Sequence, residues 1–277
     1  MPAKVYLDAA PHGDFRAMPA MGEGLAILKW VTSFPGNSSV GRPVVYGTIL
    51  VSDAGTGEPV ALVDGRAVTA LRTGAAAAVA ARALARDGAA SAGLIGCGLH
   101  GRWAALCLTA VGYRSGICAD LDPGAAQRVA DEVGWNVGAR QEAVECDVVT
   151  LVTPGTEAVI GPGDLQPGTH VNALGADGSG KAEMAIDAVI ACELFCDEWA
   201  QASHGGELTG AVEKRGLQRD RVTDLGAVLA GEAQGRSSDD AVTLFDSTGL
   251  AIQDLALVIE VLELSRSGAI EAAEVDL

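Results

Sequence analysis

Apolar and polar residues alternate in short runs near the start of the chain, and the pattern then becomes helical. Strand-like runs at residues 44–51 and 59–63, separated by a Gly- and Thr-containing turn at 53–57, predict a hairpin within a mostly β segment. From residue 69 an Ala-rich run predicts a helix that ends before Asp87-Gly88, because alanine favours helices and Asp-Gly favours turns. We therefore expect a β unit followed by one long helix.

Beyond residue 90 the apolar runs become shorter and alternate with helical patterns of about ten residues. The expected strands cover residues 91–95, 116–119, 147–152 and 169–174, and the expected helices include residues 102–111 and 125–133. This alternation is typical of an α/β fold with a doubly wound parallel sheet. A last helix is expected over residues 250–265, with Ser247 and Thr248 as its caps.

The composition narrows the class of protein. The 277-residue chain carries a net charge of −17, from 19 Lys and Arg against 36 Asp and Glu, and 49% of its residues are hydrophobic. That apolar content excludes disorder, and the acidity argues against nucleic acid and anionic membranes as partners. The chain has no apolar stretch long enough to span a membrane and no secretory signal pattern at its start, so we expect a cytoplasmic protein. The six cysteines form no C-x-x-C pair, which predicts reduced thiols and no metal site.

A glycine-rich loop, Gly96-Cys97-Gly98-Leu99-His100-Gly101, follows the expected strand at 91–95 and opens a helix. In the G-x-G-x-x-G pattern the first glycine allows a tight turn, the second lets a diphosphate approach the backbone, and the third lets the helix pack on the strand. The N-terminus of that helix offers unpaired N–H groups and a positive dipole end to the diphosphate. Asp120 ends the next strand, where an acid accepts hydrogen bonds from ribose hydroxyls and repels a 2′-phosphate. The pattern favours an NAD site over the alternative, a glycine turn beside a solvated aspartate.

A set of further motifs occurs along the chain in the order found in a known family. The motifs are Met18-Pro19-Ala20, Phe34-Pro35-Gly36-Asn37, residues 69–75, residues 165–170, residues 175–183 and residues 245–254. With the glycine loop, they resemble the ornithine cyclodeaminase/mu-crystallin family, which includes archaeal-type alanine dehydrogenases and ketimine reductases. The resemblance covers nearly the whole chain. Family members carry a longer segment before the first motif, which leaves open whether the dimer or the activity is affected here.

The resemblance implies a fold and a set of functional residues. The fold is a Rossmann-type NAD-binding domain, residues 72–251, with a smaller α+β domain for substrate binding and dimerisation, residues 1–71 with 252–277. Asp177 matches the acid that handles the reacting amine or activates water, and Lys29 and Arg72 match residues that hold the substrate carboxylate. We expect these three to be catalytic, with Lys4 and Arg16 as further substrate-binding residues and no metal ligand. The expected NAD-binding residues are Thr73, Gly96, Gly98, Leu99, His100, Gly101, Asp120, Thr153, Lys181 and Ser247.

Simpler interpretations exist for the three catalytic candidates. Arg72 could be a salt-bridge residue near a helix start, Lys29 a solvated surface lysine, and Asp177 a turn former between glycines. An acidic protein that binds an amino acid carboxylate, however, needs cations placed locally, and arginine offers two-point binding to a carboxylate. This requirement favours the functional interpretation.

The family's reactions differ in what attacks the imine: water in an amino acid dehydrogenase, the substrate's own δ-amine in an ornithine cyclodeaminase, and nothing in a reductase. Similar cyclodeaminases carry a Glu just before the Met-Pro motif, where this chain has Arg16, whose charge repels a second ammonium. The Asp120-Leu121-Asp122-Pro123 run, in contrast, is similar to NAD-using cyclodeaminases. We expect an alanine-dehydrogenase-like homodimer that uses NAD and acts on a small or acidic L-amino acid. The alternatives are an ornithine cyclodeaminase, a ketimine or pyrroline-2-carboxylate reductase, and a non-catalytic NAD-binding module.

Overall fold

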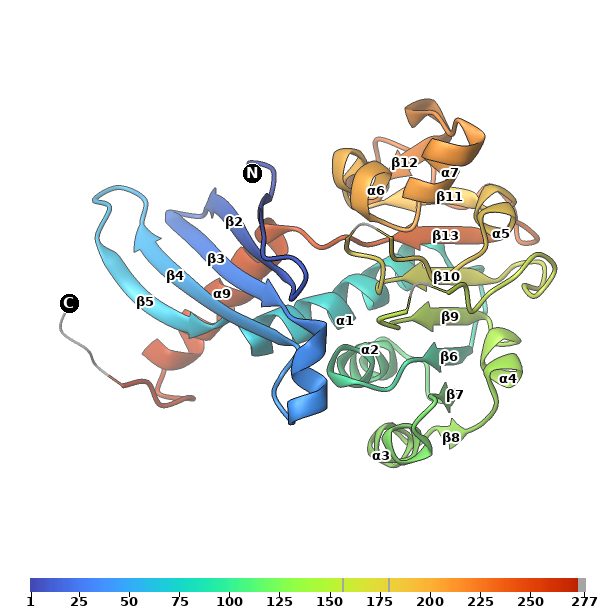
Figure 1. The fold of residues 1–277 in the computed structure, drawn as a ribbon, viewed down its shortest axis with the longest axis horizontal. Coiled ribbons are helices and arrows are strands. Elements are labelled where there is room, and N and C mark those ends of the chain that lie inside the picture. The colour runs from blue at the N-terminus through green and yellow to red at the C-terminus, as the bar shows by residue number, and fades with distance from the viewer. Residues whose placement is uncertain (156, 179, 274–277) are drawn as a thin grey trace. The chain divides into compact units, whose positions relative to one another are not determined.

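The computed structural model describes residues 1–155, 157–178 and 180–273, and it divides into two compact units. The first unit combines Met1–Arg72 with the chain from Leu250 onward, and the second is Thr73–Gly249. Helix α1 (Gly65–Leu84) begins in the first unit and ends in the second (Figure 1). The sequence expectation placed these boundaries at 71/72 and 251/252.

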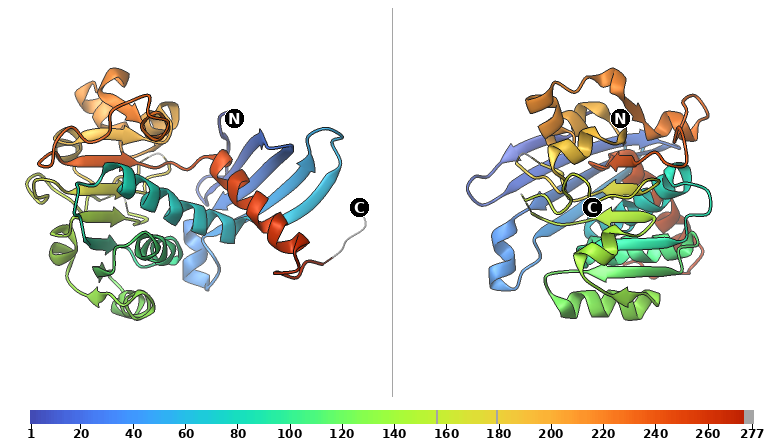
Figure 2. Two further views of the ribbon diagram at one scale, coloured as in Figure 1. Left: turned by 180° about the vertical axis from the view of Figure 1, so that it is seen from behind. Right: turned by 90° about the vertical axis from the view of Figure 1, so that its right-hand side faces the viewer.

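The first unit contains a five-stranded antiparallel sheet, in which the strands lie in the order β1-β2-β3-β4-β5. Helix α9 (Ala251–Arg266) lies across one face of this sheet (Figure 2). The strands are β1 (Val5–Asp8), β2 (Asp14–Gly22), β3 (Leu25–Ser33), β4 (Val45–Asp53) and β5 (Pro59–Asp64), with the 3-10 helix η1 (Pro35–Val40) between β3 and β4.

Side chains alternate between the two faces of this sheet, because successive residues of a strand point in opposite directions. The inner face contributes residues such as Ile27 and Ile49 to a core with Leu255 and Val258 of α9. The outer face carries exposed apolar side chains from β3, β4 and β5, namely Leu28, Trp30, Tyr46, Leu50, Val60 and Leu62. One face is thus a core and the other an apolar surface.

The second unit is an eight-stranded parallel sheet in the order β12-β11-β13-β10-β9-β6-β7-β8. Its strands are β6 (Ser91–Ile95), β7 (Ser115–Ala119), β8 (Asn136–Val137), β9 (Val148–Leu151), β10 (His170–Ala173), β11 (Glu193–Cys196), β12 (Val222–Asp224) and β13 (Thr243–Asp246). Its helices are α2 (Leu99–Ala110), α3 (Pro123–Val133), α4 (Arg140–Val144), α5 (Ile186–Ile190), α6 (Trp199–Gly205), α7 (Thr209–Arg215), the 3-10 helix η2 (Arg219–Arg221) and α8 (Leu225–Leu229). The predicted α/β class with a doubly wound parallel sheet is confirmed.

Helix α1 begins at Gly65, four residues before the predicted start at Thr69. A Cβ on Gly65 would lie 2.8 Å from the carbonyl carbon of Gly47, so glycine is required where the helix start meets β4. The Asp64 carboxylate accepts the Arg66 N–H and satisfies one of the unpaired amides at this end. The Ala-rich pattern located the body of the helix but not this close approach.

The predicted caps of the last helix are wrong. Helix α9 begins at Ala251, and its N-cap residue is Leu250, not Ser247 or Thr248. Both hydroxyls donate to the Asp197 carboxylate instead, while the Leu250 N–H donates to the Gln253 side chain. The two hydroxyls thus bind a carboxylate that is distant in the sequence instead of capping the helix that follows them.

Among the described residues, no helix is long and apolar enough to cross a membrane, and no group of His, Cys, Asp and Glu side chains has metal-binding geometry. All six cysteines are free thiols.

Candidate functional site

The glycine loop lies at the point where the strand order of the parallel sheet reverses. It follows β6, which pairs with β7 on one side and with β9 on the other. Ligands of open α/β sheets bind outside the carboxyl ends of the strands at such a switch point. The topology therefore places the predicted dinucleotide loop where a ligand is expected.

Each glycine of the loop has a distinct environment. Gly96 has a φ of +99°, and a Cβ there would collide with the Val152 carbonyl. A Cβ on Gly101 would collide with the Gly96 carbonyl, so this glycine lets α2 pack onto the loop. Gly98 faces open space, with nothing within 4 Å of its missing Cβ. Two glycines thus close the turn, and the third leaves its backbone accessible.

Helix α2 begins directly at the loop with Leu99 and His100 in its first turn. Its N-cap is Gly98, which has no side chain with which to cap the first amides. An uncapped helix start keeps its N–H groups and its positive dipole end available for an anion. The backbone geometry is therefore suited to a diphosphate.

Asp120 holds the glycine loop against the end of β7. Its Oδ2 accepts the Cys97 N–H at 2.5 Å, and its Oδ1 accepts the Asp122 N–H at 2.8 Å. An ionised carboxylate has about four lone-pair sites, so each oxygen can accept one further hydrogen bond. The carboxylate that is expected to bind the ribose therefore also fixes the glycine loop.

Two loops at the carboxyl ends of β9 and β10 are tied together by Glu183. One of its oxygens accepts the Thr153 N–H at 2.6 Å and the Thr153 hydroxyl at 2.9 Å, and the other accepts the Gly175 N–H at 2.7 Å. Burial raises the pKa of Glu183, while these donors favour its anion. Thr153, a predicted NAD-binding residue, is thereby positioned at the end of β9.

Asp177 follows Gly175 in the loop after β10 and forms an ion pair with Lys181 at 2.5 Å. Both side chains are partly exposed, so the pair is accessible to solvent. The structure thus brings together the predicted catalytic acid and a predicted NAD-binding lysine. Ser179, between them, lies outside the described residues.

Ser247 lies in the segment after β13, and its hydroxyl contacts Asp197 at 3.4 Å. Asp197 also accepts the Thr248 hydroxyl at 2.9 Å and the Gly249 N–H at 2.6 Å. Thr73, a further predicted NAD-binding residue, is buried in helix α1. Asp197 therefore fixes the loop that carries Ser247 at the same edge of the sheet as Thr153.

The two other carboxyls buried near this edge are structural. Glu207 accepts the Glu183 and Met184 N–H groups, and burial raises its pKa to about 7. Asp246 accepts the Leu208 N–H, and burial raises its pKa well above the ordinary value. Both bind backbone amides of loops in the second unit.

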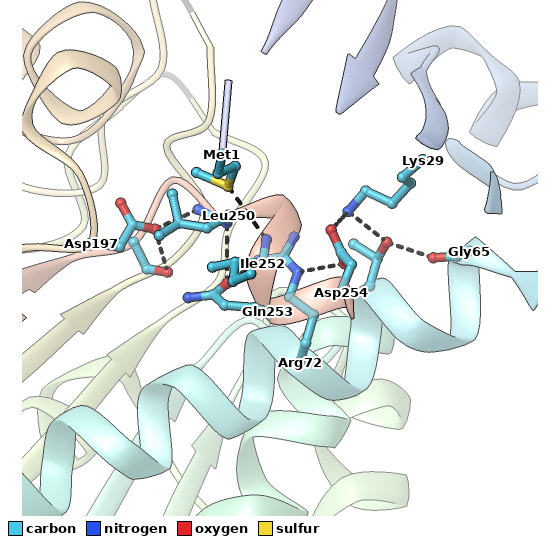
Figure 3. Close-up of polar contacts among 12 residues, drawn as sticks. Met1, Lys29, Gly65, Arg72, Asp197, Leu250, Ile252, Gln253 and Asp254 are labelled. Atoms are coloured by element: carbon cyan, nitrogen blue, oxygen red, sulfur yellow. Dashed lines mark hydrogen bonds and ion pairs between the residues drawn. The ribbon is translucent and has the colours of Figure 1, made fainter. Parts of the chain in front are cut away.

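A second cluster of charged side chains lies wholly in the first unit (Figure 3). The Lys29 Nζ on β3 lies 2.5 Å from Asp254 Oδ2 on α9, and the Arg72 Nε on α1 lies 3.3 Å from Asp254 Oδ1. Lys29 also donates to the Thr69 hydroxyl at 3.4 Å, and an Arg72 Nη contacts Gln253 Oε1 at 3.5 Å. We call Lys29, Arg72 and Asp254 the cationic triad.

The triad corrects the simpler interpretation of Lys29, whereas the ion pair expected of Arg72 under its simpler interpretation is present. Lys29 is not a solvated surface lysine, since its side chain is 1% exposed, whereas that of Arg72 is 11% exposed. Burial, followed by the charge of Arg72, lowers the pKa of Lys29 to about 7, and Asp254 opposes that shift. Arg72 is the cation of the triad with access to solvent.

The two remaining substrate-binding candidates are also in the first unit. The charge of Lys4 acts on Lys29 and lowers its pKa further, which places Lys4 near the triad. Arg16 on β2 is nearly buried, and its guanidinium binds Asp14 through Nε at 2.6 Å and Nη2 at 3.1 Å. It also lies over the Tyr6 ring. Asp14 therefore offsets the positive charge on which the argument against a second ammonium relied.

A surface pocket of ≈ 580 Å³ in the first unit is lined by none of these candidates. Its lining residues are Pro11, His12, Gly13, Phe34, Pro35, Gly36 and Asn37.

Comparison with known proteins identifies the family. The model of the ornithine cyclodeaminase/mu-crystallin family matches residues 1–269. The chain belongs to this family. It is 40% identical over 270 residues to an alanine dehydrogenase of Archaeoglobus fulgidus, covering 95% of this chain and 84% of the relative. It is 32% identical over 255 residues to an ornithine cyclodeaminase of Agrobacterium tumefaciens, covering 88% of this chain and 70% of the relative.

The fold of this family member is also similar to a solved structure. An archaeal alanine dehydrogenase dimer with bound NAD superposes with a TM-score of 0.94 at 38% identity, covering 100% of this chain and 88% of that one. The family resemblance expected from the motifs is confirmed.

The sequence does not single out Asp254, Glu183 or Asp197, whose carboxylates hold the candidate site residues in place. Two of these three, Asp254 and Glu183, lie in motifs named above. Asp254 interrupts an otherwise apolar helix face between Ala251 and Val258, and an acid on such a face is itself a signal. Glu183 closes the 175–183 motif, but nothing local indicates that it binds the loop after β9. Asp197 gives no signal in a single sequence.

Proposed function

We propose that this protein is an NAD-dependent oxidoreductase that acts at the α-carbon of a small L-amino acid through an imine, as an alanine dehydrogenase does. The single observation that carries the proposal is the glycine loop at the switch point with Asp120 bound to its backbone. The 40% identity to an alanine dehydrogenase supports the reaction class.

The residues at the loop fit an NAD molecule. Gly98 leaves open space beside the backbone, and the uncapped start of α2 provides N–H groups for the diphosphate. Asp120 keeps acceptor sites for the adenosine ribose, and its charge disfavours the 2′-phosphate of NADP. Thr153, Lys181, Ser247 and Thr73 are the further residues proposed to contact the cofactor. When bound, NAD supplies the acceptor for the hydride of the substrate.

The chain's own residues bind the substrate and move its protons. Arg72, backed by Lys29, would bind the α-carboxylate, since an arginine fork matches a carboxylate at two points. Asp177 would accept a proton from the substrate ammonium, release it to solvent and, after imine formation, accept a proton from the attacking water. The ion pair with Lys181 holds its carboxylate in the loop. Lys4 and Arg16 complete the proposed substrate-binding set.

An ornithine cyclodeaminase is the second candidate, because an enzyme of that name is 32% identical to this chain. Asp14 offsets the charge of Arg16, so Arg16 alone does not exclude a substrate with a second ammonium. The two activities differ in their use of the cofactor: a dehydrogenase accumulates NADH, whereas a cyclodeaminase returns the hydride to its product.

One assay separates the candidates. The protein is incubated with NAD and, one at a time, alanine, aspartate, glutamate and ornithine, and in a second arm with NADH and a cyclic imine. NADH absorbance and substrate consumption are followed in both arms. NADH formation with a small or acidic amino acid supports the proposal. Ornithine consumption without net NADH identifies a cyclodeaminase, activity only with NADH and a cyclic imine identifies a reductase, and NAD binding with no turnover identifies a binding module.

The Asp120→Ala variant tests the cofactor assignment. We expect the Kd for NAD to rise about tenfold or more, because hydrogen bonds to a charged acceptor are lost, and the preference for NAD over NADP to shrink. Both Kd values are measured by calorimetry. Loosening of the glycine loop alone would weaken NAD and NADP equally, so an unchanged Kd ratio contradicts the ribose assignment. Asp122→Ala, which removes a carboxylate two residues away, is the matched control.

We also propose that the protein is a cytoplasmic homodimer and binds neither nucleic acid nor membranes. The outer face of the first unit's sheet supports dimerisation, because it exposes Leu28, Trp30, Tyr46, Leu50, Val60 and Leu62 on three adjacent strands. Contiguous apolar patches of this kind mark interaction surfaces. The free cysteines support a cytoplasmic location, and the net charge of −17 argues against binding to nucleic acid or anionic membranes.

The Trp30→Asp variant tests the dimer. Burying a charge in the interface would require its desolvation, which destabilises the dimer. We therefore expect sedimentation to show a shift from dimer to monomer with the fold intact. Leu229→Asp, an equally apolar to charged change at an exposed position of α8, should remain dimeric. If the Trp30→Asp variant sediments as a dimer, this face of the sheet is not the dimer interface.

A further inference from the structure

Asp254 is fully buried in the first turn of α9 and has a cation on each oxygen. Its Oδ2 lies 2.5 Å from Lys29 Nζ, and its Oδ1 lies 3.3 Å from Arg72 Nε. The three side chains come from β3, α1 and α9, which are far apart in the sequence (Figure 3). A single carboxylate thus joins the two cations that are proposed to bind substrate.

The charges around Lys29 show why such a carboxylate is needed. Three charged groups act on it: Arg72 from α1, Lys4 from the chain before β1, and Asp254 from α9. The two cations and the burial of the ammonium all disfavour its charged form, and Asp254 is the charged group among the described residues that favours it. Without Asp254, burial beside two like charges would favour the neutral amine.

We propose that Asp254 is the positioning residue of the substrate-carboxylate site: it keeps the Lys29 ammonium charged and holds the Arg72 guanidinium beside it. The proposal rests on the proposed function, in which Arg72 and Lys29 bind the α-carboxylate. With Lys29 charged, the triad has a net charge of +1, which one substrate carboxylate neutralises.

Asp254 acts through its neighbours and does not touch substrate. Its side chain is 0% exposed, both oxygens face cations, and its charge has the same sign as the substrate carboxylate. Arg72 is further held by Gln253, the residue before Asp254, whose Oε1 also accepts the Leu250 N–H. The first turn of α9 therefore fixes the guanidinium at two points.

The Asp254→Asn variant tests the role by the pH dependence of KM. Loss of an opposite charge at this distance should lower the pH at which Lys29 loses its proton by about 1 to 3 units. The rise in KM with pH should move to lower pH by the same amount, with kcat at saturation changed much less. Asp254→Glu, which keeps the charge, should restore the midpoint toward that of the unmodified protein.

Leu255→Ala is the matched control, because Leu255 is the buried neighbour of Asp254 on α9 and lies outside the charged cluster. It should lower the thermal stability and leave the midpoint of KM unchanged. A purely structural role for Asp254 would give Asp254→Asn the same behaviour as this control, and that result overturns the proposal.

A second measurement needs no substrate and separates failure of this proposal from failure of the proposed function. The titration of Lys29 is followed by NMR of its ammonium group in the unmodified protein and in Asp254→Asn. A lower midpoint in the variant supports the proposal even if no amino acid is turned over, and equal midpoints overturn it even in an active dehydrogenase. If the Asp254→Asn variant does not fold, the same titration is done in the Arg72→Met background, with and without Asp254→Asn. In that background the loss of Asp254 leaves one buried cation without its carboxylate instead of two.

Discussion

Replacement of Asp177 by Asn is expected to reduce kcat by about 10²-fold or more while leaving the Kd for NAD unchanged. General acid–base groups contribute rate factors of this size, and an amide cannot accept the proton from the substrate ammonium or from water. Asparagine keeps the size of the side chain, so the loop after β10 should retain its shape. Kd is measured by calorimetry and kcat from NADH formation under saturating substrate.

The ion pair with Lys181 requires a control for this result, because Asp177→Asn also leaves that lysine without its carboxylate. Asp187→Asn breaks a comparable surface pair with Arg215 in the same unit and should leave kcat unchanged. Lys181→Met breaks the same pair from the other side. Because Lys181 is also proposed to contact NAD, kcat is measured with NAD at saturation. If Lys181→Met then lowers kcat as far as Asp177→Asn does, the loss comes from the broken ion pair and not from proton transfer. An active Asp177→Asn enzyme removes the acid–base role altogether.

The parallel sheet and the glycine loop were predictable from the sequence because their signals are local. Apolar runs that alternate with helices identify the sheet, and the spacing between Gly96, Gly101 and Asp120 belongs to one strand-loop-helix-strand unit. Local patterns thus gave the fold class and the position of the dinucleotide site.

The triad and the caps were not predictable in the same way, because long-range contacts decide them. Ser247 and Thr248 have the chemistry of helix caps, yet Asp197 takes their hydroxyls. Lys29 reads as a surface residue until Asp254, from the opposite end of the chain, is placed beside it. The position of Asp254 on an apolar helix face indicates that it has a partner, but a single sequence does not indicate that this partner is Lys29.

Replacement of Arg72 by Ala should raise KM for amino acids by about 10²-fold or more, with a smaller change in kcat. Two charge-assisted hydrogen bonds to the substrate carboxylate are lost, each contributing about 1.5–3 kcal/mol. Arg72 should have a larger effect than Lys29, because its side chain is 11% exposed against 1% for Lys29 and so offers the more accessible cation. Arg215→Ala, which removes an arginine from a surface ion pair, should leave KM unchanged.

A substrate without the carboxylate separates a lost contact from a general disturbance of the triad. An amino acid amide cannot make the two-point contact with Arg72, so the preference of the unmodified enzyme for the acid over the amide should largely disappear in Arg72→Ala. Arg72→Lys keeps the charge but not the fork, and it should retain part of that preference. If Arg72→Ala instead weakens turnover of acid and amide by the same factor, the arginine supports the fold of the site and the substrate carboxylate is bound elsewhere.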